Sequence, residues 1–272
     1  MTTATTAPPQ PTGTPVSQGR VILSEWIKLR SLRSTVWTLA VSVLIIVGLG
    51  LLFAAVSGAH QESHPAQSGG ADPVTLTLSG AFLAQLVVGV LGVLLITGEY
   101  STGMIRATLT AVPRRLPVLW AKIAVFTVVA FVISAISALI AFLAGQAILS
   151  SDHVPSASLT DPGALRTVIG AALYLTVVGL LGMGLGCIIR STAGTITSLF
   201  GILLVLPILG AVLPTNWSND ISPYLPSNAG QAVMQLTRGS NSLAPWTGFA
   251  LFVGYTAVVI VVAAVMLRRR DA

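Results

Sequence analysis

Apolar positions along the chain fall into six long blocks that are separated by shorter polar segments. The blocks are Val36–Val56, Leu76–Thr97, Ile123–Leu149, Val168–Ile189, Ala193–Leu213 and Trp246–Leu267. None of them contains Asp, Glu, Lys, Arg or His, and each approaches the roughly 20 residues that an α-helix needs to cross a bilayer. Membrane barrels show alternating strands of about 10 residues instead. The pattern therefore predicts an all-α integral membrane protein with six transmembrane helices.

Composition agrees with this fold and indicates one boundary, between an N-terminal tail and the transmembrane domain. Charged residues make up 8% of the 272 residues, against roughly 25% in a soluble domain. The first 18 residues are rich in Thr and Pro and have no apolar periodicity, so we expect a disordered tail over 1–18. Residues 19–272 then form the six-span transmembrane domain.

The basic residues predict the orientation of the spans. Six spans place both termini on one side, and 12 of the 14 basic residues lie on that side. The two exceptions are Arg166 and Arg238. By the positive-inside rule, both termini are cytoplasmic. The basic residues thus set topology and contact anionic membrane lipids, so the high pI of about 10.3 indicates no nucleic-acid partner.

A basic amphipathic segment precedes the first span, with the sequence RVILSEWIKLRSLR over 20–33. On a helical wheel one broad face is apolar and the opposite face is polar. The apolar face holds Ile22, Leu23, Trp26, Ile27 and Leu29, and the polar face holds Arg20, Ser24, Lys28 and Ser31. Arg30 and Arg33 fall toward the apolar side, where they can reach lipid phosphates. The pattern favours an in-plane helix at the membrane surface, the alternative being a simple extension of the first span.

The loop between the second and third spans contains a second short helical pattern. Ser101 and Thr102 are suitable N-cap residues, and Pro113 ends a helix from the other side. Between them Ile105, Leu109 and Val112 recur at helical spacing and form a narrow apolar ridge. This pattern is compatible with a docking helix for a soluble partner. It is equally compatible with an ordinary basic loop that sets topology.

Several motifs together resemble the permease subunits of ABC-2 type ATP-binding-cassette exporters, especially actinobacterial ones. An E-x-x-K-L-R-S segment begins at Glu25, and a turn of sequence RSTAG begins at Arg190. The extracellular stretch LPSNAG begins at Leu225. The loop matches a G-E-Y/F-x-x-G-x-I-R-x-T-L motif through Gly98, Glu99, Tyr100, Gly103, Ile105, Arg106, Thr108 and Leu109. Met104 stands where the motif often has Thr.

The resemblance implies roles for both soluble segments. Residues 20–33 become a connecting helix, in which Glu25, Trp26, Lys28, Arg30 and Arg33 lie at the membrane surface. Tyr100–Val112 becomes a coupling helix that contacts a separate ATPase subunit, and Arg114 and Arg115 flank it. We also expect Glu99 to anchor the end of the second span to this coupling helix by pairing with a nearby basic residue. The resemblance also implies a homodimer, or a heterodimer with a similar permease, and a partly re-entrant segment between spans five and six.

The chain carries no recognisable catalytic or cofactor site of its own. A phosphate-binding loop needs G-x-x-x-x-G-K-[ST], and neither of the two lysines follows a glycine. We therefore expect ATP and Mg to bind the partner subunit, and this chain to be no enzyme by itself. We also expect no metal site, because His60, Glu62 and His64 lie in a Gly- and Pro-flanked loop.

The spans themselves offer few features that bear on a substrate path. Gln85 is the one strongly polar side chain near the middle of a span, and Pro207 predicts a kink in the fifth span. Gly182 and Gly186 have the G-x-x-x-G spacing that permits close helix packing, with packing inside one protomer as the default. Ionisable groups, which usually mark ion-coupled pathways, are missing from all six blocks. The path therefore favours an apolar or amphipathic substrate moved by a separate motor.

These observations predict an exporter permease for a drug, an antibiotic or a lipid-like molecule. Its location is the plasma membrane of a bacterial cell, since the predominance of Arg over Lys is typical of a GC-rich genome. Two other classes stay open. One is an ATP-independent carrier or channel, and the other is a non-transporting immunity or sensory subunit.

Overall fold

The computed structural model describes residues 18–63, 72–101, 103, 115–152, 154–239 and 242–269. All regular elements within these ranges are helices, in agreement with the predicted all-α fold. The first half comprises α1 (Gln18–Ser31), α2 (Arg33–Ser63), α3 (Pro73–Leu78), α4 (Gly80–Ser101), α6 (Arg115–Ser151) and α7 (Ala164–Ile189). The second half comprises α8 (Thr192–Phe200), η1 (Gly201–Val205), α9 (Leu206–Val212), α10 (Thr215–Ile221), η2 (Ser222–Tyr224), α11 (Pro226–Gln231), η3 (Ala232–Met234) and α12 (Pro245–Arg269).

Six helical regions among the described residues are long and apolar enough to cross a membrane, which is the predicted number. They are Arg33–Ser57, Pro73–Ser101, Leu116–Ser151, Ala164–Ile189, Thr192–Val212 and Pro245–Arg269. Their best windows have mean hydropathies between 2.2 and 2.9. The second region combines α3 with α4, and the fifth combines α8, η1 and α9.

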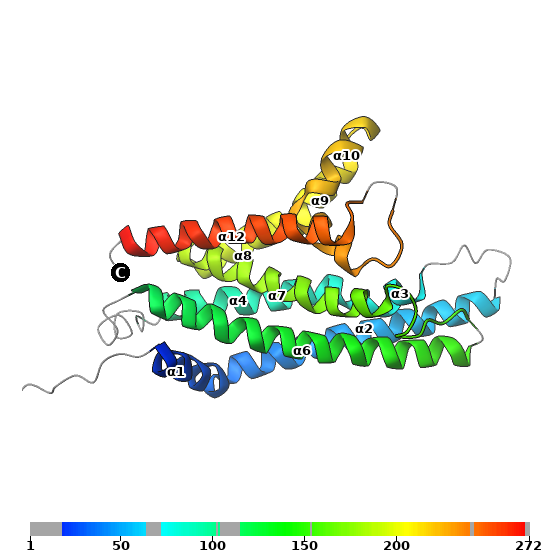
Figure 1. Ribbon diagram of the computed structural model, residues 1–272, viewed down its shortest axis with the longest axis horizontal. Coiled ribbons are helices and arrows are strands. Elements are labelled where there is room, and N and C mark those ends of the chain that lie inside the picture. The colour runs from blue at the N-terminus through cyan, green and yellow to red at the C-terminus, as the bar shows by residue number, and fades with distance from the viewer. Residues whose placement is uncertain are drawn as a thin grey trace, which may run out of the picture.

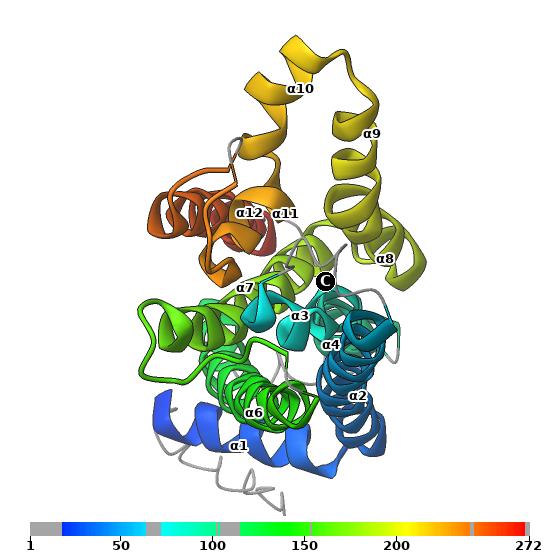
Figure 2. The same cartoon turned by 90° about the vertical axis from the view of Figure 1, so that its right-hand side faces the viewer.

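The long helices form a bundle with α7 at its centre (Figures 1 and 2). In Figure 2, α2, α4 and α6 lie on one side of α7, whereas α8 to α12 lie on the other. The most apolar window of α7 is 72% buried, against 22% for the corresponding windows of α2 and α12. Helix α1 crosses the end of α6 and also contacts α2. The C-terminal end of α12 lies at this same end of the bundle, which we call the α1 end.

Glycines allow α4 and α7 to approach each other closely. A Cβ atom on Gly92 would lie inside contact distance of the Gly179 carbonyl oxygen. A Cβ atom on Gly182 would lie 2.5 Å from the Gly89 carbonyl oxygen, and one on Gly186 would contact Ile96. The G-x-x-x-G pair of the fourth span therefore packs against α4 of the same chain. Small residues are what permits such backbone contact between membrane helices.

The fifth span departs from regular α-helix geometry just before Pro207. Residues Gly201–Val205 form a π-helical turn, and α9 then begins at Leu206. Proline has no N–H to donate to the preceding turn, so the hydrogen-bond ladder is interrupted at this place. The predicted irregularity is therefore present as a π-helical segment. Beyond it, α9 and α10 project away from the bundle (Figure 2).

The segment between spans five and six returns to the bundle after this projection. Helix α11 packs against α12, and η3 packs against both α7 and α12. A Cβ atom on Gly230 would lie 2.6 Å from the Tyr174 ring and 2.7 Å from the Phe252 ring. At the same end the Arg166 guanidinium donates to the carbonyl oxygens of Gln235 and Leu236, at 3.1 and 3.3 Å. These contacts fix residues 226–236 against α7 and α12. That this segment re-enters a membrane stays a prediction.

The close α4–α7 crossing predicts that Gly92→Ala destabilises the protein. The new methyl group meets backbone rather than a side chain that can rotate away, so we expect a loss of about 1–3 kcal/mol in the free energy of unfolding. Gly48→Ala is the matched control, because nothing lies within 4 Å of its Cβ position. That control should be neutral or stabilising by up to about 1 kcal/mol, since alanine favours helix. Thermal unfolding of both purified variants checks this, and equal melting temperatures would contradict the crossing.

Candidate functional site

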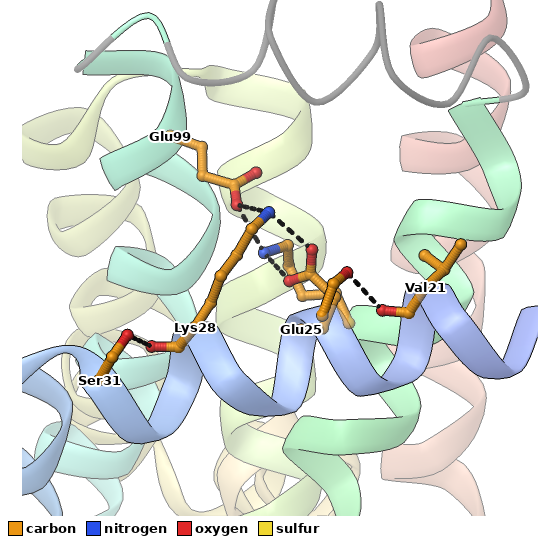
Figure 3. A network of polar contacts seen from close by, with 7 residues as sticks. Val21, Glu25, Lys28, Ser31 and Glu99 are labelled. Atoms are coloured by element: carbon orange, nitrogen blue, oxygen red, sulfur yellow. Dashed lines mark hydrogen bonds and ion pairs between the residues drawn. The ribbon is translucent and has the colours of Figure 1, made fainter. Parts of the chain in front are cut away.

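Four charged side chains converge at the α1 end of the bundle, as Figure 3 shows. Glu25 and Lys28 come from α1, Glu99 comes from the last turn of α4, and Lys122 comes from the second turn of α6. We call these four residues the charge cluster. They include both lysines of the chain and two of its three glutamates.

Each lysine of the charge cluster bridges both glutamates. The Lys122 ammonium donates to Glu25 Oε2 at 2.6 Å and to Glu99 Oε1 at 2.9 Å. The Lys28 ammonium donates to Glu25 Oε1 at 2.9 Å and to Glu99 Oε1 at 3.3 Å. Two positive and two negative groups give a formal charge of zero. The cluster therefore forms a closed, neutral network across three helices.

Burial makes this network sensitive to the loss of any member. The side chains of Glu25 and Lys122 are only 4% and 8% exposed, and that of Glu99 is 11% exposed. Lys28 is the most accessible, with 29% of its side chain exposed. Removing one partner from a buried ion pair leaves the other charge uncompensated and costs about 3–5 kcal/mol. The cluster consequently holds α1 in one position against α4 and α6.

The two α1 residues of the cluster have shifted pKa values. Burial acts to raise the pKa of Glu25, but the charge and hydrogen bonds of Lys122 and Lys28 outweigh it and hold the pKa below its ordinary value. Burial acts to lower the pKa of Lys28, but Glu25 and Glu99 outweigh it and raise the pKa. Both shifts favour the charged forms of Glu25 and Lys28 at neutral pH.

The faces of α1 differ from those expected from the helical wheel. Val21, Glu25 and Leu29 are buried against the bundle at i, i+4 and i+8. Lys28 turns into the bundle with Glu25, although the wheel placed it on the solvent side. The outward face is apolar and carries Ile22, Leu23, Trp26 and Ile27, which are 38–58% exposed. Arg30 and Arg33 are exposed as well.

Most of the cluster is not predicted from the sequence, in which Lys122 is one of the basic residues that set topology and Glu25 and Lys28 are expected at the membrane surface. A basic partner for Glu99 is expected, and in the structure Lys122 and Lys28 are its partners. One signal was available: Glu25 and Lys28 stand at i and i+3, the spacing of neighbours on a helix surface. Nothing in the local sequence connects that pair to Glu99 or Lys122, which lie in distant helices.

Of the loop that is expected to contact an ATPase, the structure describes only residues near its two ends. Tyr100 belongs to the last turn of α4, and the Arg190 guanidinium lies 5.2 Å from its ring centroid. Gly103 has a φ of +71°, a left-handed conformation that commonly follows the end of a helix. Arg115 is the first residue of α6. Ile105, Arg106, Thr108, Leu109 and Arg114 lie outside the described residues, so the coupling helix stays a prediction.

The two residues expected to border a substrate path lie in different surroundings. Gln85 is fully buried, and its carbonyl oxygen accepts a hydrogen bond from the Tyr174 hydroxyl. The Tyr174 hydroxyl accepts in turn from Gln231 Nε2 at 3.3 Å, so this polar chain joins α4, α7 and α11. Pro207 lies on the projecting α9 instead.

In the part of the chain that the structure describes, no group of three His, Cys, Asp or Glu residues is placed to hold a metal ion. Cys187 is buried in α7. The absence of a metal or cofactor in the whole chain stays a prediction.

The charge cluster predicts that Lys122→Met is strongly destabilising. The two buried carboxylates would share only Lys28, so we expect a loss of about 3–5 kcal/mol in the free energy of unfolding. Lys122→Arg is the control that keeps the charge, and it should cost clearly less. Combining Lys122→Glu with Glu99→Lys tests the pairing itself, because the double variant should recover part of what each single reversal loses. Additive losses in that cycle would show that the two residues do not interact.

The pKa shifts of Glu25 and Lys28 also predict how stability depends on pH. A lowered folded-state pKa for Glu25 means that its contribution is lost as the pH falls below the ordinary value of 4.5. A raised folded-state pKa for Lys28 means that its contribution is present below the ordinary value of 10.5 and is lost as the pH rises further. Melting temperatures should therefore be level between these limits and fall on both sides. In Glu25→Gln the melting temperature should fall less steeply at acid pH than in the unsubstituted protein. An equally steep fall would contradict the assignment of this loss of stability to Glu25.

The match to a known family covers the helices that build this site. A family model described as ABC-2 family transporter protein matches residues 21–200, from α1 to the end of α8. A search of curated proteins finds no match to the chain. The matched region includes all four residues of the charge cluster and spans well over half of the 272 residues. With its six apolar helices, the chain is a multi-pass membrane protein that belongs to the ABC-2 transporter family.

Proposed function

We propose that the chain is the transmembrane permease subunit of an ATP-binding-cassette exporter. A separate ATPase subunit, which binds ATP and Mg, drives it, and the chain itself catalyses no reaction. The observation that carries the proposal is the position of the charge cluster. It joins α1, α4 and α6 at the two ends of the loop that is expected to contact the ATPase, in a chain of the ABC-2 family.

The charge cluster offers a route for force from the motor to the spans. Helix α4 ends at Ser101 and α6 begins at Arg115, so a push on the loop between them acts on both helices. Glu99 and Lys122 tie these two helix ends to each other and to α1. The three helices then move as one unit, and the close contact of Gly92 with Gly179 passes the movement to α7. This unit would alternate between inward-open and outward-open arrangements.

A cavity toward the other end of the bundle supports an apolar or amphipathic substrate. Its volume is about 500 Å³, and it lies between α2, α3, α4, α11 and η3. Phe53 and Phe82 give it aromatic walls, and the Gln231 amide gives it a polar group. Gln85 acts on this cavity indirectly, because it orients Tyr174, which bonds to Gln231. Binding sites of this kind combine mostly apolar walls with a few convergent polar groups, and a drug, an antibiotic or a lipid-like molecule would suit it.

The projecting helices support a dimer in the membrane. Ile208 and Val212 on α9 are 62% and 78% exposed within the single chain. A second permease, identical or similar, would cover this face, and lipid would cover the remainder. We place the α1 end and both termini in the cytoplasm of a bacterial cell, because the basic residues gather there.

The proposed coupling predicts that Arg106→Ala and Leu109→Ala uncouple the motor from transport. Hot-spot residues near the centre of an interface cost about 2 kcal/mol or more when truncated, so we expect substrate-stimulated ATPase activity in the reconstituted complex to fall about tenfold or more. Arg238→Ala is the control, because it removes an exposed arginine near the opposite end, whose Nε donates to the nearby Ser242 carbonyl oxygen. Unchanged coupling in both loop variants would overturn the assignment of the loop.

The same reconstitution separates the two other classes of function. Transport by the purified chain without ATP or a partner would establish a carrier or channel. A complex that binds the ATPase but moves nothing across vesicles would establish an immunity or sensory subunit.

A further inference from the structure

A cavity of about 210 Å³ lies directly beside the charge cluster at the α1 end. Helices α1, α2, α4 and α6 all contribute to its lining. The mechanism proposed above uses the cluster as a structural tie and assigns nothing to this space. Three properties of the lining indicate what it holds: its position, its charges and its apolar walls.

The position of the cavity connects it to one leaflet of the membrane. Leu94 on α4 and Leu32, between α1 and α2, line the cavity and are 37% and 47% exposed. The outward face of α1 is apolar and carries Trp26, which is typical of a helix that lies in the membrane interface. The cavity therefore stands at the depth where lipid head groups meet acyl chains, and its exposed leucines border the acyl region.

Among the described residues that line the cavity, the charged side chains have both signs, and their formal charges sum to zero. Lys28 is the most exposed member of the cluster, and its ammonium group lies beside the Glu99 carboxylate (Figure 3). Ser34 and Thr35, in the first turn of α2, also line the cavity. The Thr35 N–H in this turn donates to the Leu32 carbonyl oxygen at 3.1 Å, and the partial positive charge at the N-terminus of a helix favours a negative group nearby. One part of the lining thus suits an anion, and the Glu99 carboxylate suits a cation.

Apolar side chains complete the lining and exclude a free ion as the natural occupant. Leu29, Leu91, Leu95 and Val125 line the cavity together with the polar groups. An occupant must therefore pair a compact zwitterionic group with hydrocarbon. Because the four charges of the cluster compensate one another, a ligand with net charge would bring an uncompensated charge into this partly buried site, which is costly.

We propose that this cavity binds one phosphatidylethanolamine molecule from the leaflet at the α1 end. Its phosphate lies near Lys28 and the first turn of α2, its primary ammonium donates to the Glu99 carboxylate, and its acyl chains run along Leu94. Phosphatidylcholine has no N–H to donate to Glu99, and phosphatidylglycerol brings a negative charge with no cation for the carboxylate. The site thus discriminates between head groups, and it fixes α1 against α2 on the side that the charge cluster leaves open.

The test is a competition between lipids on the purified full-length chain. The chain is placed in nanodiscs with equal amounts of phosphatidylethanolamine, phosphatidylcholine and phosphatidylglycerol of matched acyl chains, and the lipids retained after release are counted by native mass spectrometry. Each charge-assisted hydrogen bond that is lost weakens binding by about tenfold, so phosphatidylethanolamine should be enriched about tenfold over both competitors. This measurement needs no ATPase and no transport, so its failure leaves the proposed function untouched.

Thr38→Phe tests the location, because Thr38 lines the cavity on α2 and is not part of the charge cluster. The matched control is Thr197→Phe on α8. Both hydroxyls donate to the carbonyl oxygen four residues earlier in their own helix, at 2.7 Å to Ser34 and 3.0 Å to Ala193. Thr38→Phe should abolish the enrichment, and Thr197→Phe should keep it, with similar melting temperatures for both.

Four results would overturn the proposal. Equal retention of the three lipids would show that no head group is recognised, and a preference for phosphatidylglycerol would show an anion site instead. Enrichment that survives in Thr38→Phe would place the lipid elsewhere. If the released species is a lipid-free dimer that dissociates in Thr38→Phe, a second copy of the chain is the occupant.

Discussion

The neutral charge cluster is the interaction on which the arrangement at the α1 end depends. A charge inside a helical bundle is tolerated when it is paired and hydrogen-bonded, since burial removes the water that would otherwise solvate it. Glu25, Lys28, Glu99 and Lys122 meet this condition by bridging one another across three helices. An amphipathic helix such as α1 would otherwise be free to slide in the interface. The cluster gives it a defined position and links it to the ends of α4 and α6.

Close helix packing extends from the charge cluster through α4 and α7, but it does not include the projecting part of the fifth span. Helices α4 and α7 touch through Gly92 and Gly179, and α7 in turn packs on α6 and α12. The fifth span differs, because a π-helical turn interrupts it before Pro207 and α9 then projects away from the bundle. Helices α4, α6 and α7 thus pack closely on one another, whereas α9 keeps apolar side chains such as Ile208 and Val212 exposed. In the proposed dimer, a second permease would cover this face of α9.

The sequence predicts the spans well because the signal is local and strong. A charge-free block of bilayer length forms a helix whichever helices it packs against, and Pro207 interrupts its helix in any packing environment. The cluster is different, since Lys122 pairs with Glu25 at a separation of 97 residues, and periodicity carries no information at that range. Gln85 illustrates the same limit. Its polarity marked it as unusual, but only the tertiary structure shows that Tyr174 occupies its carbonyl oxygen.

The choice of lysine inside the cluster has a physical reason. Of the 14 basic residues, the two lysines are the ones placed in the cluster, and the chain uses arginine elsewhere. Arginine presents a planar fork that suits one carboxylate at a time, whereas an ammonium group is compact and donates in three directions. Both lysines here reach carboxylates on two different helices from one nitrogen atom. Guanidinium groups would need a wider space between α1, α4 and α6. Both lysines of this chain therefore stand where α1, α4 and α6 meet, and arginine occupies all the other basic positions.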